Sequence, residues 1–135
     1  MVTIEGRYVG GLRCEATHGP SGSKILTDAP VDNMGKGEAF SPTDLVATAL
    51  GTCIVTTMAI VAERRGIDFA GASFLVEKHM ATDPVRRIGR LPVTIRLPAS
   101  LDPETRTILE RAAYTCPVHK SLHPDVAAPI SFQYV

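Results

Sequence analysis

The chain has 135 residues, of which 44% are hydrophobic and 21% are charged, a composition typical of one folded soluble domain spanning residues 1–135. Its 14 basic and 14 acidic side chains give a formal net charge of zero, and only 5% of the residues are aromatic. This balance gives no reason to expect nucleic acid or a membrane surface as the partner, and aromatic platforms for stacking bases are scarce.

The N-terminal third of the sequence predicts a small group of strands. Residues 2–18 alternate loosely and are rich in β-branched residues, with Gly10 and Gly11 in the middle, so they predict two short strands around a turn. A turn over Gly19–Gly22 and a third strand over Lys24–Asp28 follow. Residues 29–40 then form a long loop, a length typical of a functional or interface segment.

A long helix begins immediately after this loop. Ser41 is the predicted N-cap, Pro42 suits the first helical position, and Asp44 completes a capping box. The helix is expected to run to about Arg65, with Gly66 as its C-terminal stop.

This helix carries 18 uncharged residues between Asp44 and Glu63, which reaches the length of a membrane span. Its threonines and alanines, and the absence of aromatic anchors at its ends, favour instead a central helix of a soluble protein that is buried on most sides. A chain this short has difficulty covering such a helix alone, so we expect a partner chain on one side. The residues expected to let a second helix approach closely are Ala47, Ala49, Gly51 and Thr52.

The C-terminal half predicts two strands, over residues 71–80 and 91–97, paired as a hairpin. A second helix, capped by Asp102, is expected to run to about Tyr114, and a short helical piece follows Cys116. A final strand covers residues 129–134. The order βββ-α-ββ-α-β indicates an α+β fold.

Three cysteines are the candidates for chemistry: Cys14, Cys53 and Cys116. Their odd number, and an N-terminus without the pattern of a secretory leader, predict a reducing cytoplasm. Cys116 precedes a proline that opens a helix, where free N–H groups and the helix dipole would lower its pKa, so position alone makes it the more acidic thiol. Cys53 lies within the long helix, where it is either a small core residue or a reactive thiol. Cys14 is assigned no role.

A metal site is an alternative for part of this set. Cys116, His119 and His123 have a ligand-like spacing, and Cys53 could be a fourth ligand. No closely spaced pair of cysteines of the C-x2-C type accompanies them, and we therefore expect no metal and no cofactor.

Two segments of the chain resemble a known family. Residues 41–53 (SPTDLVATALGTC) are similar to the helix signature of the OsmC/Ohr superfamily, the osmotically inducible and organic hydroperoxide resistance proteins. Residues 116–122 (CPVHKSL) resemble its second cysteine motif. The pattern at residues 19–22 and 28–30 is closer to the OsmC-like branch than to Ohr proper.

The resemblance implies an OsmC-like fold in an intertwined homodimer, with long central helices wrapped by sheets from both chains. It also implies a thiol-dependent peroxidase that reduces organic hydroperoxides. Cys53 would attack the peroxide and become a sulfenic acid, and Cys116 would resolve it as a disulfide. An external dithiol, often of the lipoyl type in this family, would then reduce the disulfide.

The chain departs from the family at two supporting positions. The family supports its attacking thiol with an Arg that is held by a Glu, and these positions are Pro20 and Thr43 here. Asp44 lies one residue beyond Thr43, and the candidate replacements for the arginine are Arg13, His18 and Lys24. His119, beside Cys116, is a further candidate, as a group that lowers the thiol pKa or as a general acid.

These departures keep a second function open. It is a non-catalytic dimer of the same fold that binds a small apolar ligand.

Overall fold

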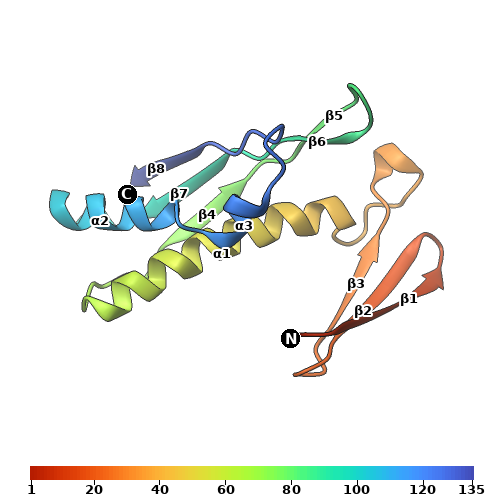
Figure 1. Cartoon of the computed structure of the whole chain (residues 1–135), viewed down its shortest axis with the longest axis horizontal. Helices are drawn as coiled ribbons and strands as arrows, with labels where there is room; N and C mark the ends of the chain where they lie inside the picture. The colour runs from red at the N-terminus through yellow and green to blue at the C-terminus, as the bar shows by residue number, and fades with distance from the viewer. The chain divides into compact units, whose positions relative to one another are not determined.

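The computed structural model describes residues 1–135, which form two compact units, Met1–Val46 and Ala47–Val135 (Figure 1). The first holds β1 (Ile4–Gly10), β2 (Arg13–His18), β3 (Lys24–Asp28) and the short 3-10 helix η1 (Val31–Asn33). The helix α1 (Pro42–Arg64) runs from the first unit into the second. The second continues with β4 (Ser73–Val76), β5 (His79–Ala81), β6 (Arg87–Arg90), β7 (Val93–Leu97), α2 (Pro103–Ala113), α3 (Pro117–Ser121) and β8 (Ile130–Tyr134). The predicted α+β class is confirmed; the assignment of one domain stays a prediction.

The first unit is a three-stranded antiparallel sheet in the order β1-β2-β3. Its turn uses positive φ angles at Gly10 and Gly11, which glycine adopts without strain, and the predicted turn lies there. Because side chains alternate across a sheet, the register places one set of weakly polar residues on a single face. They are Ile4, Tyr8, Cys14, Ala16 and Ile25, and the polar side chains of His18 and Thr27 lie on the same face. Ile4 and Tyr8 are more than 60% exposed, so the first unit itself leaves this face open at β1.

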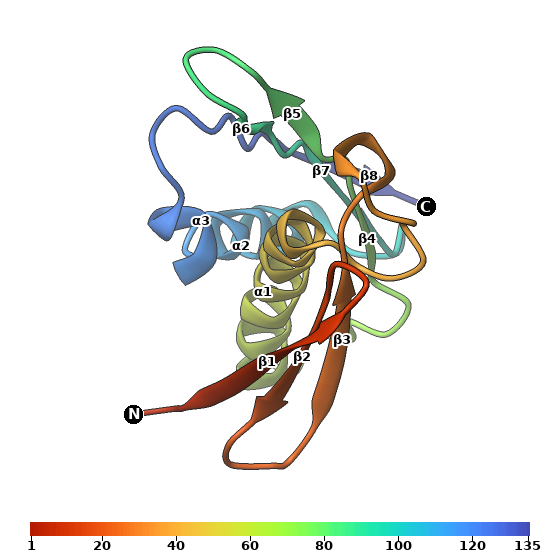
Figure 2. The same ribbon diagram turned by 90° about the vertical axis from the view of Figure 1, so that its right-hand side faces the viewer.

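The second unit is built on the sheet β4-β7-β8, in which β4 is antiparallel and β8 parallel to the central β7. α1 and α2 lie on the same face of this sheet (Figures 1 and 2). The core lies between these helices and the sheet, and its largest side chains are each less than 2% exposed. They are Leu50, Ile54 and Met58 of α1, Leu91 before β7, Ile95 and Leu97 of β7, and Leu109 of α2.

The predicted pairing of residues 71–80 with residues 91–97 is confirmed for β4 and β7, but the two predicted strands are not continuous. Its base is the pair β4–β7, and its tip is the separate two-stranded sheet β5–β6. Pro92 has no N–H to donate, so the β7 ladder begins at Val93, and the Pro92 carbonyl accepts the N–H of Glu77 at 3.1 Å. The hairpin is therefore broken at the level of the proline.

α1 begins with the predicted capping box. The Ser41 N–H donates to the Asp44 carboxylate at 2.9 Å, and the Asp44 N–H donates to the Ser41 hydroxyl at 3.1 Å. These reciprocal bonds satisfy the first free N–H groups of a helix that carries Cys53 further along.

Only one face of α1 is buried within the chain. Its apolar 18-residue stretch would be long enough for a membrane span by length and composition, as core helices of soluble proteins also are, and 33% of it is buried here. The residues Thr52, Thr56 and Ile60 on its other side are exposed. The second unit therefore buries α1 on one face and not on most sides, and cover by a partner chain stays a prediction.

The expected role of Gly51 was wrong. A Cβ atom there would lie 2.5 Å from the ring of Phe74 and 2.8 Å from a methyl of Val76. The missing side chain of Gly51 therefore lets α1 pack closely against β4 of the same chain. Ala47 is buried like Gly51, whereas Ala49 and Thr52 are exposed. Of the four small residues, only Ala49 and Thr52 are left open for another helix.

Candidate functional site

Two thiols from distant parts of the sequence meet in the second unit. Cys53 lies in the middle of α1, and Cys116 is the N-cap of the short helix α3. Their side chains are hydrogen-bonded to each other, and both are free thiols. Cys116 is fully buried, whereas Cys53 is partly exposed. The structure therefore brings together the two cysteines expected to act as a pair.

Cys53 has a lowered pKa in this setting. Burial raises the pKa of its thiol, but three hydrogen bonds outweigh burial, and the pKa lies below the usual value of a cysteine. The donors are the Cys116 thiol, the backbone N–H of Val118 and the Thr57 hydroxyl. Each donor stabilises the thiolate form, which is the nucleophilic form of cysteine.

Cys116 has a raised pKa, and the sequence-based expectation that it is the more acidic thiol was wrong. Burial raises its pKa most, and the hydrogen bond with Cys53 and the charge of Cys53 raise it further. The N–H groups of His119 and Val118 act in the opposite direction and offset only part of this. The start of α3 does lower the pKa of Cys116 as expected, because the His119 N–H donates to its sulfur at 3.4 Å. Burial beside a second thiol raises the pKa by more than this bond lowers it.

His119 contributes its backbone, rather than its ring, to the thiol. The ring atom Nε2 lies 3.0 Å from the carbonyl oxygen of Ala128, and the ring packs edge-on against Tyr114 with centroids 6.4 Å apart. The exposed His123 ring accepts the N–H of Asp125 through Nδ1. No group of three or more His, Cys, Asp and Glu side chains is arranged to hold a metal ion, so the alternative metal site is not supported.

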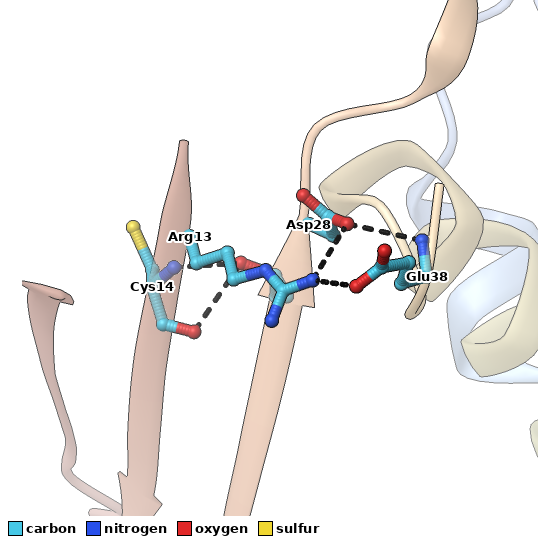
Figure 3. Close-up of polar contacts among 5 residues, drawn as sticks. Arg13, Cys14, Asp28 and Glu38 are labelled. Atoms are coloured by element: carbon cyan, nitrogen blue, oxygen red, sulfur yellow. Dashed lines mark hydrogen bonds and ion pairs between the residues drawn. The ribbon is translucent and has the colours of Figure 1, made fainter. Parts of the chain in front are cut away.

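An ion-pair cluster lies in the first unit. The Arg13 guanidinium reaches from β2 to the Asp28 carboxylate at 3.4 Å and to the carboxylate of Glu38 (Figure 3). The same Asp28 oxygen accepts the backbone N–H of Glu38 at 3.0 Å, which closes the loop after β3. The other oxygen, Oδ1, is buried without a hydrogen-bond partner. The contacts at Oδ2 therefore offset the free-energy cost of burying the Asp28 carboxylate.

Of the three proposed replacements for the family arginine, only Arg13 is held by two carboxylates. His18 contacts the Ser21 hydroxyl at 2.6 Å, and Lys24 lies 3.4 Å from Glu15. Asp44 is engaged in the capping box of α1. The backbone N–H and carbonyl of Cys14, on the exposed sheet face, bond to the Thr27 hydroxyl.

An open cavity of about 480 Å³ lies beside α3. It is lined mainly by apolar residues and by two histidines. The lining residues are His119, Leu122, His123, Pro124, Val126, Ala127, Ala128 and Pro129. A cavity of this size and character suits a small apolar molecule.

Comparison with known proteins identifies the family. The family model described as OsmC-like protein matches residues 35–130, which include both cysteine motifs. The chain belongs to the OsmC family. An OsmC-fold protein from Psychrobacter arcticus, provisionally described as an osmotic stress induced and detoxification response protein, is 47% identical. The match covers 98% of this chain and 96% of that one, with a TM-score of 0.91.

More distant structures share the OsmC fold. An organic hydroperoxide resistance protein OsmC from Legionella pneumophila is 17% identical with a TM-score of 0.79, over 98% of this chain and 96% of that one. The organic hydroperoxide resistance protein OhrB of Bacillus subtilis is 19% identical with a TM-score of 0.71, over 98% of both chains. No curated protein matches the chain.

Sequence reasoning missed two groups at the thiols of this OsmC-family chain. Thr57 lies four residues after Cys53, a spacing that places both side chains on one helix face and could have indicated the contact. Val118 contributes only its backbone N–H, which no side-chain pattern reveals. The ion pairs of Arg13 with Asp28 and Glu38 were also missed, because they depend on how the loop after β3 closes.

Proposed function

We propose that this protein is a thiol-dependent peroxidase that reduces organic hydroperoxides through Cys53 and Cys116. The observation that supports it most is the hydrogen-bonded thiol pair in which Cys53 is the more acidic member. The substrate class is suggested by the names of the proteins from Legionella pneumophila and Bacillus subtilis, both organic hydroperoxide resistance proteins.

The first step is attack of the Cys53 thiolate on the terminal oxygen of the hydroperoxide. A sulfur–oxygen bond forms and the oxygen–oxygen bond breaks, which leaves Cys53 as a sulfenic acid. The alkoxide leaving group takes a proton and departs as the alcohol. Thr57 and the Val118 N–H stabilise the attacking thiolate before this step.

The second step is attack of Cys116 on the sulfenic sulfur, which forms the disulfide and releases water. Cys116 is protonated at first, because burial and the neighbouring thiolate raise its pKa. Once Cys53 has become an uncharged sulfenic acid, its charge no longer raises the pKa of Cys116. The His119 and Val118 N–H groups continue to favour the thiolate, so the two thiols are activated in sequence.

Turnover requires an external reductant. A dithiol, of the lipoyl type that the family resemblance implies, would reduce the disulfide by thiol–disulfide exchange. No metal or organic cofactor takes part in this scheme. The proposed setting is the cytoplasm, without nucleic acid or membrane as a partner.

The proposed active form is a homodimer. The uncovered side of α1 and the exposed weakly polar face of the first sheet are surfaces that a second chain would bury. Sedimentation at micromolar concentration tests this, and a clean monomer would count against it.

Arg13 stays the proposed counterpart of the family arginine, because carboxylates hold it as a Glu holds that arginine. His18, Asp44 and His119 make other contacts, so we give them no direct part in the peroxide step. The variant Arg13→Gln is expected to slow peroxide reduction while leaving the thiols intact.

Binding of a small apolar ligand is the second candidate, favoured by the cavity beside α3. One experiment separates the two functions. The reduced protein receives one equivalent of cumene hydroperoxide, and thiols, mass and disulfide-linked peptides are measured. A peroxidase loses two thiols, with a Cys53–Cys116 link and a mass loss of about two hydrogens.

Variants assign the roles in the same experiment. Cys53→Ser should consume no peroxide, and Cys116→Ser should stop at the sulfenic acid after one turnover. Cys14→Ser is the matched control and should behave like the starting protein. Three unreacted thiols after peroxide would reject the peroxidase and leave ligand binding as the function.

A further inference from the structure

His119 connects the thiol pair to the edge of the neighbouring sheet. The segment before β8 runs beside β6 and β7, where the Ala127 N–H donates to Gly89 at 3.1 Å and the Leu91 N–H donates to Ala127 at 2.8 Å. In an extended chain the groups of the next residue point the opposite way. The Ala128 carbonyl therefore faces away from β6, and it is paired with Nε2 of His119 at 3.0 Å.

The hydrogen atom of this bond belongs to the histidine ring. A carbonyl oxygen only accepts, so Nε2 of His119 carries the hydrogen and donates it to Ala128. Both the singly protonated ring and the imidazolium ion can satisfy this bond. The ring also packs on Tyr114, so it is held from two sides while its backbone faces the sulfur of Cys116.

The helix that presents the N–H groups has little support of its own. α3 contains only five residues, a length at which helices do not hold their shape without outside contacts. The bonds that close its ends are local ones, from the Lys120 N–H to the Cys116 carbonyl at 3.1 Å and from the Ser121 hydroxyl to the Pro117 carbonyl at 2.8 Å. The side chain of His119 is therefore an external anchor in the turn whose N–H groups meet the two sulfurs.

We propose that His119 is a positioning residue: its hydrogen bond to Ala128 fixes the first turn of α3 and so aims the N–H groups of Val118 and His119 at the sulfurs of Cys53 and Cys116. This inference extends the proposed function by naming what holds its thiolate in place. The ring acts through the backbone of α3 and not on the reacting atoms themselves. This differs from the general-acid role that the sequence suggested for His119.

The test compares His119→Gln with His119→Met, both in a Cys14→Ser background. Glutamine and methionine have similar length and similar helix propensity, but only glutamine carries an N–H that can replace Nε2. The reduced proteins are alkylated with iodoacetamide over a range of pH, and modification of Cys53 is followed by peptide mass. No peroxide is present, so the result is independent of whether the protein is a peroxidase.

His119→Met is expected to slow alkylation of Cys53 about threefold to tenfold below the midpoint of the pH profile and to move that midpoint upward, because a charge-assisted hydrogen bond is weakened. His119→Gln should recover most of the rate. His123→Met, the matched control on the exposed histidine of the same segment, should leave the profile unchanged.

Equal profiles for the glutamine and methionine variants would overturn the proposal, as would an equal loss in His123→Met. Circular dichroism and melting curves accompany each variant. If both substitutions at residue 119 unfold the protein to the same extent, the missing N–H is not the cause and the proposal also fails.

Discussion

Oxidation of the thiol pair is expected to stabilise the protein strongly. Cys53 and Cys116 are about 60 residues apart in the sequence, and a bond that closes a loop of this length removes about 4 kcal/mol of conformational freedom from the unfolded chain in the chain-entropy account. The two thiols already interact side chain to side chain, so a disulfide of about 2.05 Å would join groups that are neighbours in the fold.

This stabilisation corresponds to a higher melting temperature of the oxidised protein. Unfolding entropy of about 2.1 cal/mol/K per residue over 135 residues converts about 4 kcal/mol into a rise of up to about 15 °C. Thermal unfolding of the oxidised and the reduced protein in a Cys14→Ser background, at one fixed protein concentration, measures this rise. Cys53→Ser, which cannot form the bond, serves as the control and should melt at one temperature under both conditions.

One result would contradict the expected stabilisation by the disulfide. If the oxidised protein has lost two thiols and carries the Cys53–Cys116 link but melts at or below the temperature of the reduced protein, closing the bond strains the fold. The sulfurs would then be less well arranged for bonding than their hydrogen bond indicates.

Two further predictions concern α1. Thr57→Val removes the hydroxyl donor without changing the shape of the side chain, so the pKa of Cys53 should rise and its alkylation below the midpoint should slow by about threefold to tenfold, as peptide mass mapping over a pH series would detect. An unchanged profile would show that this hydroxyl does not stabilise the thiolate. Gly51→Ala should lower the free energy of unfolding by roughly 1 kcal/mol, since overpacking against Phe74 exceeds the gain in helix propensity. In a Phe74→Ala background the loss should be clearly smaller, because only the Val76 methyl at 2.8 Å then lies close to the added Cβ, and denaturant titration that gives the same loss in both backgrounds would contradict the packing argument.

The sequence predicted the helix starts well, because capping is local chemistry. Ser41 and Asp44 form the expected reciprocal bonds, and the Asp102 carboxylate accepts the Thr105 N–H at 2.8 Å. The break in the hairpin does not follow from strand periodicity, because it depends on the single N–H donor that Pro92 lacks.

The site was predicted less completely than the fold. The pairing of Cys53 with Cys116 followed from the family resemblance, but the order of their acidities did not follow from position. The N–H groups at the start of α3 were expected to act on Cys116 alone, whereas the Val118 N–H also serves Cys53. Burial decides the order, and burial of Cys116 results from long-range packing that no local pattern contains.

The unequal exposure of the two sulfurs has a consequence for how an oxidised pair would be reopened. Thiol–disulfide exchange requires the incoming sulfur to approach in line with the bond that breaks, and Cys116 offers no surface for that approach. An external thiol can therefore bond only to Cys53, and Cys116 must depart as the leaving group, toward the N–H groups that favour its thiolate. Burial thus makes the exchange regioselective, and every reductant of this chain would form its transient adduct on the sulfur of Cys53.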